Sequence, residues 1–221
     1  MKVKIAVVLF IIAVITLYLS PIFDQKLAEI PYDMVSHTFY GETHLWVKII
    51  YYGVNVSTAL LIILPLVVLL RSRKAPADRR VIIRRMIVIS YLSLAIGPGL
   101  LVNKLFKENW GRARPYQVIR DGHQFSLPWQ PHFNRPADNS FPSGHVSIGA
   151  FIGVPFLVAR RRKLGVTLCA LGFVVVGVAR WLQGGHYFSD IVFAAIIVWL
   201  ITLLVINFVD KHIFTRKVTH G

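Results

Sequence analysis

The chain has 221 residues, of which 55% are hydrophobic, and its mean hydropathy is +0.60. Its apolar runs are longer than the core of a soluble domain requires, which argues against an ordinary soluble protein. The formal net charge of +15 leaves two explanations open. The basic residues either bind nucleic acid or lie in loops on the cytoplasmic side of a membrane.

Six apolar stretches follow one another along the chain. Because a helix needs about 20 largely apolar residues to cross a bilayer, they predict an all-α fold: an integral membrane bundle of six transmembrane helices, forming a single membrane-embedded domain over residues 1–221. The stretches are Ile5–Phe23, Leu45–Leu70, Met86–Phe106, Val146–Ala159, Leu164–Ala179 and Ile191–Val209. The first resembles a signal peptide, but no small-x-small cleavage motif precedes Asp24, so we expect it to be retained as a span.

The basic residues separate between the two sides of such a bundle when the N-terminus is placed in the cytoplasm. The inner side then holds 16 basic residues, namely Lys2, Lys4, seven between Arg71 and Arg85, four in Arg160–Lys163, and Lys211, Arg216 and Lys217. Only Asp78 and Asp210 oppose them there, whereas basic and acidic residues nearly balance on the outer side. This asymmetry is typical of membrane proteins, so we expect a bilayer and no nucleic acid as partner.

A long outer loop, residues 107–142, separates the third and fourth stretches. It contains five prolines and the aromatic residues Trp110, Tyr116, Trp129 and Phe141. Loops of this length in compact domains are usually functional or disordered, and the aromatic residues argue against disorder. They are interpreted either as anchors at the membrane interface or as substrate contacts.

Three polar clusters lie at the outer ends of the predicted spans. They are Lys107 to Arg114-Pro115, then Pro142-Ser143-Gly144-His145, and then Arg180 to His186 to Asp190. The predicted topology places all three on the same side of the membrane. Together they contain cations and a helix start, which suit phosphate oxygens, and two histidines and a carboxylate, which suit nucleophilic and acid–base chemistry.

Each cluster residue also has a structural explanation. A cation at the end of a span can be an interfacial anchor, Ser143 can be only an N-cap, and Asp190 can cap the next helix. If the segment from His186 to Asp190 is helical, the carboxylate is close enough to hold one imidazole nitrogen. The other nitrogen would then be an oriented nucleophile. The occurrence of all these residues on one face favours the chemical explanation.

The three clusters resemble the tripartite motif of the type 2 phosphatidic acid phosphatase, or lipid phosphate phosphatase, superfamily. The family pattern is Lys, six residues, Arg-Pro; then Pro-Ser-Gly-His; then Ser-Arg, five residues, His, three residues, Asp. The chain departs from it at Ala179, where the family has Ser, which removes one hydroxyl near the phosphate. The motifs cover residues 107–190, and the six-span layout extends the resemblance over nearly the whole chain.

The resemblance implies a role for each motif residue. His186 attacks phosphorus and becomes a phosphohistidine, Asp190 orients it, and His145 protonates the departing lipid oxygen and then activates a water. The residues implied to hold the phosphate are Lys107, Arg114, Ser143, Gly144 and Arg180. No metal and no other cofactor is expected. Arg112 lies outside the motif and is interpreted as a contact to the substrate headgroup.

The predicted function is therefore the dephosphorylation of a membrane lipid, which is the expected partner of the site. Residues 110–115 and 183–190 are similar to bacterial lipid A phosphatases. This implies lipid A as the substrate and a location in the bacterial inner membrane. The asymmetry of the basic residues adds that both termini lie in the cytoplasm and that the active site lies on the periplasmic face. Undecaprenyl diphosphate, phosphatidylglycerol phosphate and phosphatidic acid are alternative substrates, and transfer of the phosphate to a second lipid is an alternative to hydrolysis.

Other protein classes fit the sequence less well. Vanadium haloperoxidases share the anion site by resemblance but are soluble. A transporter or lipid-binding scaffold would not need a nucleophile, an acid and a carboxylate together. A metal site would have to use the four outer histidines His123, His132, His145 and His186, whose spacing matches no usual ligand pattern.

Overall fold

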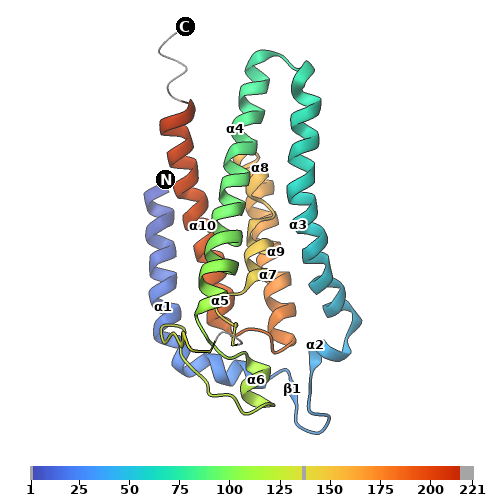
Figure 1. Ribbon diagram of the computed structural model, residues 1–221, viewed down its shortest axis with the longest axis vertical. Helices are drawn as coiled ribbons and strands as arrows, with labels where there is room; N and C mark the ends of the chain where they lie inside the picture. Colours follow the sequence, from blue (N-terminus) through green and yellow to red (C-terminus); the bar gives the residue numbers. More distant parts are fainter. Residues whose placement is uncertain (1, 136–137, 215–221) are drawn as a thin grey trace.

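The computed structural model describes residues 2–135 and 138–214, which form a bundle of long helices with a short hairpin (Figure 1). The helices are α1 (Lys2–Glu29), α2 (Tyr40–Thr43), α3 (Leu45–Arg71), η1 (Ser72–Lys74), α4 (Ala77–Leu94), η2 (Ala95–Phe106), α5 (Lys107–Asn109), α6 (Pro115–Ile119), α7 (Gly144–Phe151), α8 (Val154–Val158), α9 (Arg162–Leu182), α10 (Phe188–Val209) and η3 (Asp210–Phe214). Strands β1 (Tyr32–Asp33) and β2 (Thr38–Phe39) pair antiparallel. Arg216 and Lys217 lie outside the described residues.

Five helical segments are long and apolar enough to cross a membrane. They are Val3–Glu29, Leu45–Lys74, Ala77–Asn109, Arg162–Leu182 and Phe188–Ile213. The predicted all-helical membrane bundle is thus confirmed. The fourth predicted stretch forms the shorter segment Gly144–Val158, in which α7 and α8 are separated by a turn. The count of six spans therefore stays a prediction.

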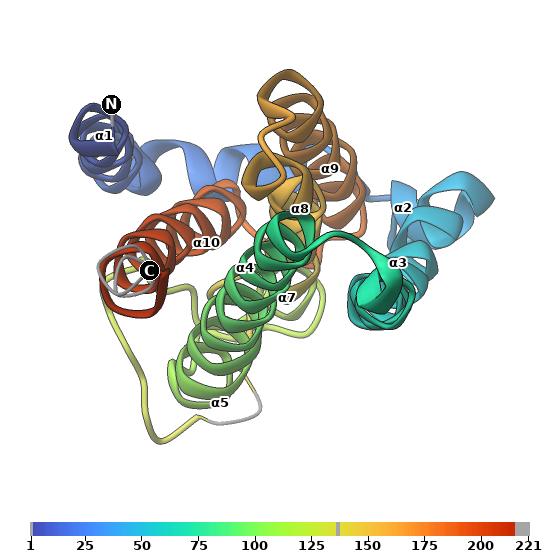
Figure 2. The same ribbon diagram turned by 90° about the horizontal axis from the view of Figure 1, so that it is seen from above.

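The short helices α7 and α8 occupy the interior of the bundle. Helix α7 contacts α9 and α10, α8 contacts α9 and α4, and α1 packs along α10 (Figure 2). Glycines permit the close approach to α9, since a Cβ on Gly149 would lie 2.5 Å from the Gly172 carbonyl oxygen and a Cβ on Gly153 would lie 1.9 Å from that of Gly165. Small residues at helix crossings are typical of membrane proteins.

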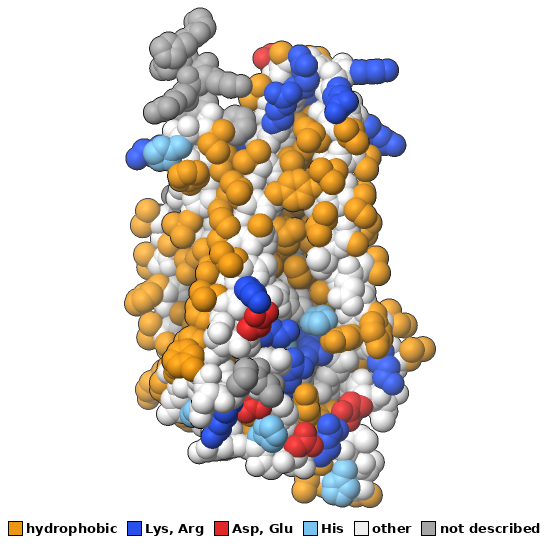
Figure 3. Space-filling model, in the orientation of Figure 1, with side chains coloured by type: hydrophobic (Ala, Val, Ile, Leu, Met, Phe, Trp, Pro, Cys, Tyr) orange, Lys and Arg blue, Asp and Glu red, His pale blue; other side chains and the backbone are white. Residues whose placement is uncertain are grey.

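The surface separates into an apolar belt and two charged ends. In Figure 3, Lys and Arg side chains gather at the upper end, hydrophobic side chains cover the middle, and basic, acidic and His side chains mix at the lower end. The basic link between α3 and α4 lies at the upper end, whereas α2, α6 and the β1–β2 hairpin lie at the lower end (Figure 1). The three polar clusters belong to the lower end.

The third long segment changes its helical type as it approaches this end. Helix α4 continues into the π-helical η2, which contains Pro98 and ends just before Lys107. Proline has no N–H to donate to the preceding turn, and the Pro98 carbonyl oxygen accepts a hydrogen bond from Asn103 Nδ2 at 2.7 Å. π-helical turns occur frequently at functional sites, and this one leads directly to the first cluster.

Candidate active site

The fold brings the three polar clusters together at the lower end of the bundle. Arg114 directly precedes α6, Ser143 precedes α7, Arg180 lies in the last turn of α9, and the loop between α9 and α10 carries His186. One backbone hydrogen bond joins the second and third clusters, from the Ser143 N–H to the Asp190 carbonyl oxygen at 3.2 Å, and His186 also bonds to the carbonyl of Ser140, two residues before the second cluster. Sequence spacing alone could not establish this proximity.

His186 is held with one ring nitrogen bonded and the other free. It is 1% exposed, and its Nδ1–H donates to the Ser140 carbonyl oxygen at 2.7 Å. Its Nε2 is buried and has no hydrogen-bond partner among residues 2–135 and 138–214. Burial lowers the pKa of His186 from 6.5 to about 3, and the positive charges of Arg180 and Arg114 act in the same direction. The imidazole is therefore neutral at pH 7, as a nucleophile requires.

Asp190 does not hold His186 by the direct hydrogen bond that the sequence predicted. Its Oδ2 lies 3.8 Å from His186 Nδ1, too far for a hydrogen bond. Instead Oδ2 accepts from Ser140 Oγ at 2.6 Å and from the Tyr187 N–H at 2.9 Å. Asp190 therefore positions His186 through Ser140, which binds the carboxylate with its hydroxyl and the imidazole with its carbonyl. Ser140 belongs to no motif, and only the folded chain reveals it.

His145 lies against an aromatic ring that the sequence analysis did not select. Tyr51, in α3, stacks on the imidazole with ring centroids 4.3 Å apart and an interplanar angle of 18°. The Arg180 guanidinium carbon lies 5.0 Å from the same Tyr51 ring. Tyr51 thus fixes both an acid–base candidate and a cation of the site. No spacing rule connects residue 51 with residues 145 and 180, because they meet only through tertiary packing.

The start of α7 carries the Ser143-Gly144 pair that the sequence predicts to bind phosphate. Ser143 precedes the helix, but its side chain makes no capping hydrogen bond, and its buried Oγ has no partner in the described part of the chain. This weakens the interpretation of Ser143 as a simple N-cap. Gly144 has a packing reason to be glycine, because a Cβ there would lie 2.3 Å from Asn103 Oδ1. Its role in binding phosphate through the backbone N–H remains a prediction.

Three cations surround this helix start. Arg114 and Arg180 both lie close enough to Lys107 and to His145 to act on them electrostatically. Arg114 donates from Nε and Nη2 to the neutral Asn139 side chain at 3.0 and 2.6 Å. Arg180 bonds to Gln183 but leaves its buried Nε without a partner among the described residues. Such concentrated and incompletely neutralised positive charge is suited to a phosphate group.

Arg112 does not contact the substrate headgroup, contrary to the sequence interpretation. Its side chain is 0% exposed. It donates to the carboxylates of Asp24 and Asp190, to Ser189 Oγ and to the Ser126 carbonyl oxygen. Burial by itself would lower the pKa of Arg112, but the two carboxylates raise it above its usual range, so the guanidinium stays charged. The sequence places Arg112 outside the motif, but it cannot show that the side chain is buried.

The outer histidines have different surroundings. His145 and His186 belong to the site described above, whereas the partly exposed His123 pairs with Asp138 at 2.9 Å. Within residues 2–135 and 138–214, no group of three or more His, Cys, Asp or Glu side chains is arranged to hold a metal ion.

The aromatic residues of the long loop differ in their surroundings. Trp110 packs against Phe106 and Phe141, with ring centroids 5.3 and 5.2 Å away, and its indole N–H donates to the Pro128 carbonyl oxygen at 2.9 Å. Tyr116, in contrast, lines a polar cavity together with Arg114 and Arg180. The loop is thus stabilised by its own aromatic core, and Tyr116 is the aromatic residue placed for a substrate contact.

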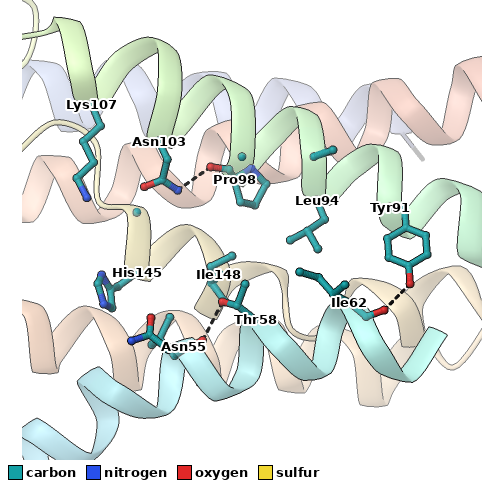
Figure 4. Close-up of a pocket in the computed structure, with 14 residues that line it drawn as sticks. Asn55, Thr58, Ile62, Tyr91, Leu94, Pro98, Asn103, Lys107, His145 and Ile148 are labelled. Carbon is teal, nitrogen blue, oxygen red and sulfur yellow. Dashed lines mark hydrogen bonds between the residues drawn. The ribbon is translucent and has the colours of Figure 1, made fainter. Parts of the chain in front are cut away.

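Two cavities meet the cationic site. One of about 510 Å³ lies between α3, η2 and α7, and Figure 4 shows Lys107 and His145 pointing toward each other at one end of it. Its opposite end is formed by apolar residues including Ile62 and Leu94. The second, of about 350 Å³, is lined by Arg114 and Arg180 with polar neighbours. The cations thus border an apolar cavity on one side and a polar cavity on the other.

Comparisons with known proteins agree with this geometry. Residues 87–214 match the family model described as the PAP2 superfamily. A protein of Francisella tularensis subsp. novicida (strain U112) named lipid A 4'-phosphatase is 38% identical over 127 residues, which are 55% of this chain and 57% of the relative. A Rhizobium leguminosarum protein of the same name is 30% identical over 118 residues, 51% of this chain and 48% of the relative. The matches thus span about half the length of these curated relatives.

No solved structure gave a significant match. The family model includes all three polar clusters and covers more than half of the chain. The chain belongs to the PAP2 superfamily.

Proposed function

We propose that the protein removes a phosphate group from a membrane lipid through a phosphohistidine formed at His186. One observation carries this proposal. Four buried polar atoms of the site lack hydrogen-bond partners in the described part of the chain: Ser143 Oγ, His145 Nε2, Arg180 Nε and His186 Nε2. Buried polar atoms in native proteins are nearly always paired, so unpaired atoms from three separate segments indicate the binding site of a polar ligand. The adjacent cations favour an anion.

The geometry supports an in-line displacement at phosphorus. His186 Nε2 attacks while Nδ1–H stays bonded to Ser140, and the P–O bond to the lipid breaks. The bound phosphate brings negative charge beside His145, which favours its protonated form, and His145 gives its proton to the departing oxygen. Lys107, Arg114 and Arg180 stabilise the charge on the equatorial oxygens. Water, deprotonated by His145, then attacks the phosphohistidine and releases phosphate.

The apolar cavity supports a lipid as the leaving group. It begins at His145, the proposed proton donor, and continues between helices toward Ile62 and Leu94. A substrate whose phosphate lies among the cations can therefore extend its apolar part between α3 and η2. Charged side chains are costly inside a bilayer, so we place the cations at the level of the lipid headgroups.

Lipid A is the substrate that we propose first. Both curated relatives are named lipid A 4'-phosphatase, and the polar cavity beside Arg114 and Arg180 offers space for a headgroup. The excess of basic residues at the opposite end of the bundle supports a bacterial inner-membrane protein with cytoplasmic termini and its site on the periplasmic face.

The test is a substrate panel with purified protein in detergent. Lipid A, undecaprenyl diphosphate, phosphatidylglycerol phosphate and phosphatidic acid are each incubated with and without a chelator, and phosphate release is measured. We expect the fastest release from lipid A and no effect of the chelator. Release from none of the four lipids would contradict the proposed function. Radiolabelled phosphate appearing on a second lipid, rather than in solution, would replace hydrolysis by phosphotransfer.

A further inference from the structure

Asp24, near the end of α1, reaches the catalytic site although it lies far outside the sequence motifs. It is 1% exposed, and its carboxylate accepts hydrogen bonds from three donors. Oδ1 accepts from the Ser189 N–H at 3.0 Å, and Oδ2 accepts from Ser189 Oγ at 2.6 Å and from Arg112 Nη2 at 2.8 Å. Three hydrogen-bond donors, one of them a guanidinium, favour the ionised carboxylate and oppose the effect of its burial.

Asp24 and Asp190 share one guanidinium. Arg112 donates from Nη2 to Asp24 and from Nη1 to Asp190, and all three side chains are 0% exposed. Nη1 also donates to Ser189 Oγ at 2.8 Å, which in turn donates to Asp24. The Arg112 guanidinium carbon lies 4.3 Å from the centre of the Tyr187 ring, which covers its face. The arrangement holds α1 and α10 on opposite sides of one cation.

This cluster has one negative charge in excess, because two carboxylates face one guanidinium. If Arg112 were paired with Asp190 alone, the pair would be neutral and would offer little to a positive charge on His186. With Asp24 present, two carboxylates share the Arg112 guanidinium, so its charge does not fully neutralise Asp190. Asp190 therefore keeps negative charge 3.8 Å from His186 Nδ1. Electrostatic interactions over such distances are strong in a buried site.

We infer that Asp24 is a positioning residue for catalysis: by pairing with Arg112, it leaves Asp190 with the charge that stabilises the imidazolium formed when His186 bonds to phosphorus. The imidazole is neutral before attack and carries a positive charge once Nε2 is bonded to phosphorus and Nδ1 keeps its proton. The positive charge that develops on His186 therefore offsets the excess negative charge of the cluster to a greater extent in the transition state than in the ground state. Interactions of this kind raise kcat rather than substrate affinity. The inference rests on the proposed function and deepens it.

The test is the full-length Asp24→Asn protein, which keeps the size of the side chain and removes its charge. We expect kcat to fall about 10- to 100-fold, as for other residues that act through a ligand or nucleophile, with KM unchanged. Orthovanadate, which can take the five-coordinate geometry of the transition state, should inhibit more weakly by the same factor. Competitive inhibition by inorganic phosphate, which reports only the cationic site, should be unchanged.

Ser20→Ala is the matched control. Ser20 lies one turn earlier on the same helix, is 2% exposed, and bonds only to the Leu17 carbonyl of its own helix among the described residues, so its kcat should equal that of the wild type. If Asp24→Asn weakens vanadate and phosphate inhibition alike, the substitution has damaged α1 in general and the inference is overturned. A wild-type kcat in Asp24→Asn would also overturn it. If Asp24→Asn cannot be recovered folded, Ser189→Ala is the substitute, because it loosens Asp24 without removing charge. It should lower kcat and vanadate inhibition in the same way but by a smaller factor. Wild-type values in Ser189→Ala would overturn the inference.

The wild-type measurement separates this inference from the proposed function. A wild-type protein that releases no phosphate from any lipid of the panel overturns the proposed function. An active wild type with an equally active Asp24→Asn protein overturns the role of Asp24 alone.

Discussion

Arg112 and Arg114 lie two residues apart and have opposite surroundings. Arg112 is completely buried, and its donors are used by two carboxylates, a hydroxyl and a backbone carbonyl. Arg114 bonds through its side chain to the neutral Asn139 and lines an open cavity. The donors of Arg112 are satisfied by the protein itself, whereas the region around Arg114 and Arg180 keeps a buried donor that no described residue uses. We propose that the first region maintains the shape of the site and that the second binds the phosphate.

The difference follows from the cost of burying charge. A buried charge without a partner is strongly unfavourable, so a cluster such as Asp24–Arg112–Asp190 must be complete to be tolerated. The cations of the binding region avoid this cost in part because they border two cavities. Substitutions in the first region should therefore be able to lower stability as well as activity, whereas substitutions in the second should lower activity with little loss of stability.

The largest effect is expected for Arg112→Gln, which removes the cation between two buried carboxylates. Removing one partner of a buried ion pair costs about 3–5 kcal/mol of stability. Arg112→Gln leaves two buried carboxylates without their cation. Thermal unfolding in detergent should show a large fall in melting temperature, accompanied by loss of activity. A stable and active Arg112→Gln protein would contradict the assignment of this region.

Arg180→Gln should give a comparable loss of activity with little loss of stability. Removing one donor that stabilises a transition-state oxyanion costs about 10²–10³-fold in kcat, while Arg180 has a buried Nε that no described residue uses. The paired measurement is kcat and melting temperature for Arg180→Gln beside Arg112→Gln. If both variants lose stability equally, the two regions do not differ as proposed.

The pH dependence of stability should report the burial of His186. Its pKa is about 3 in the folded protein against 6.5 when unperturbed, so below pH 6.5 the unfolded chain binds a proton that the folded chain excludes. Stability is therefore present above pH 6.5 and is lost as the pH falls, by about 1 kcal/mol per pH unit. His186→Asn should lose less stability between pH 6.5 and 5.5 in melts recorded in parallel. Equal slopes would show that His186 titrates normally.

The smallest effect is expected for Tyr51→Leu, which removes the ring that packs on His145 and Arg180. Aromatic stacking contributes about 0.5–1.5 kcal/mol, so kcat/KM should fall about 2- to 10-fold. Tyr52→Leu is the matched control, because the neighbouring ring is 64% exposed. An unchanged rate in Tyr51→Leu would mean that the His145 orientation does not depend on stacking.

The sequence predicted those features that depend on composition and spacing. Apolar stretches marked the long helices, and the clusters around Lys107, His145 and His186 marked the site that the fold brings together. The short segment Gly144–Val158 was harder to delimit, because an interior helix packed on glycines needs neither the length nor the flanking residues of a lipid-exposed span.

Features that depend on tertiary contact could not be predicted. Asp24 and Ser189 are 165 residues apart, and no periodicity relates them. Spacing suggested a direct contact between His186 and Asp190, but the chain inserts Ser140 between the two groups. Arg112 is a basic residue beside the first motif, and the sequence therefore suggests a substrate contact. Only its burial in the structure shows otherwise.

His186 is proposed to carry the phosphoryl group during turnover. Purified protein is mixed with lipid A labelled in its phosphate, quenched within the first turnover, and digested for mass spectrometry. We expect a phosphate on His186 that is stable in alkali and labile in acid, and absent from His186→Asn, which should also release no phosphate. Label on another residue, or full phosphate release by His186→Asn, would contradict the account.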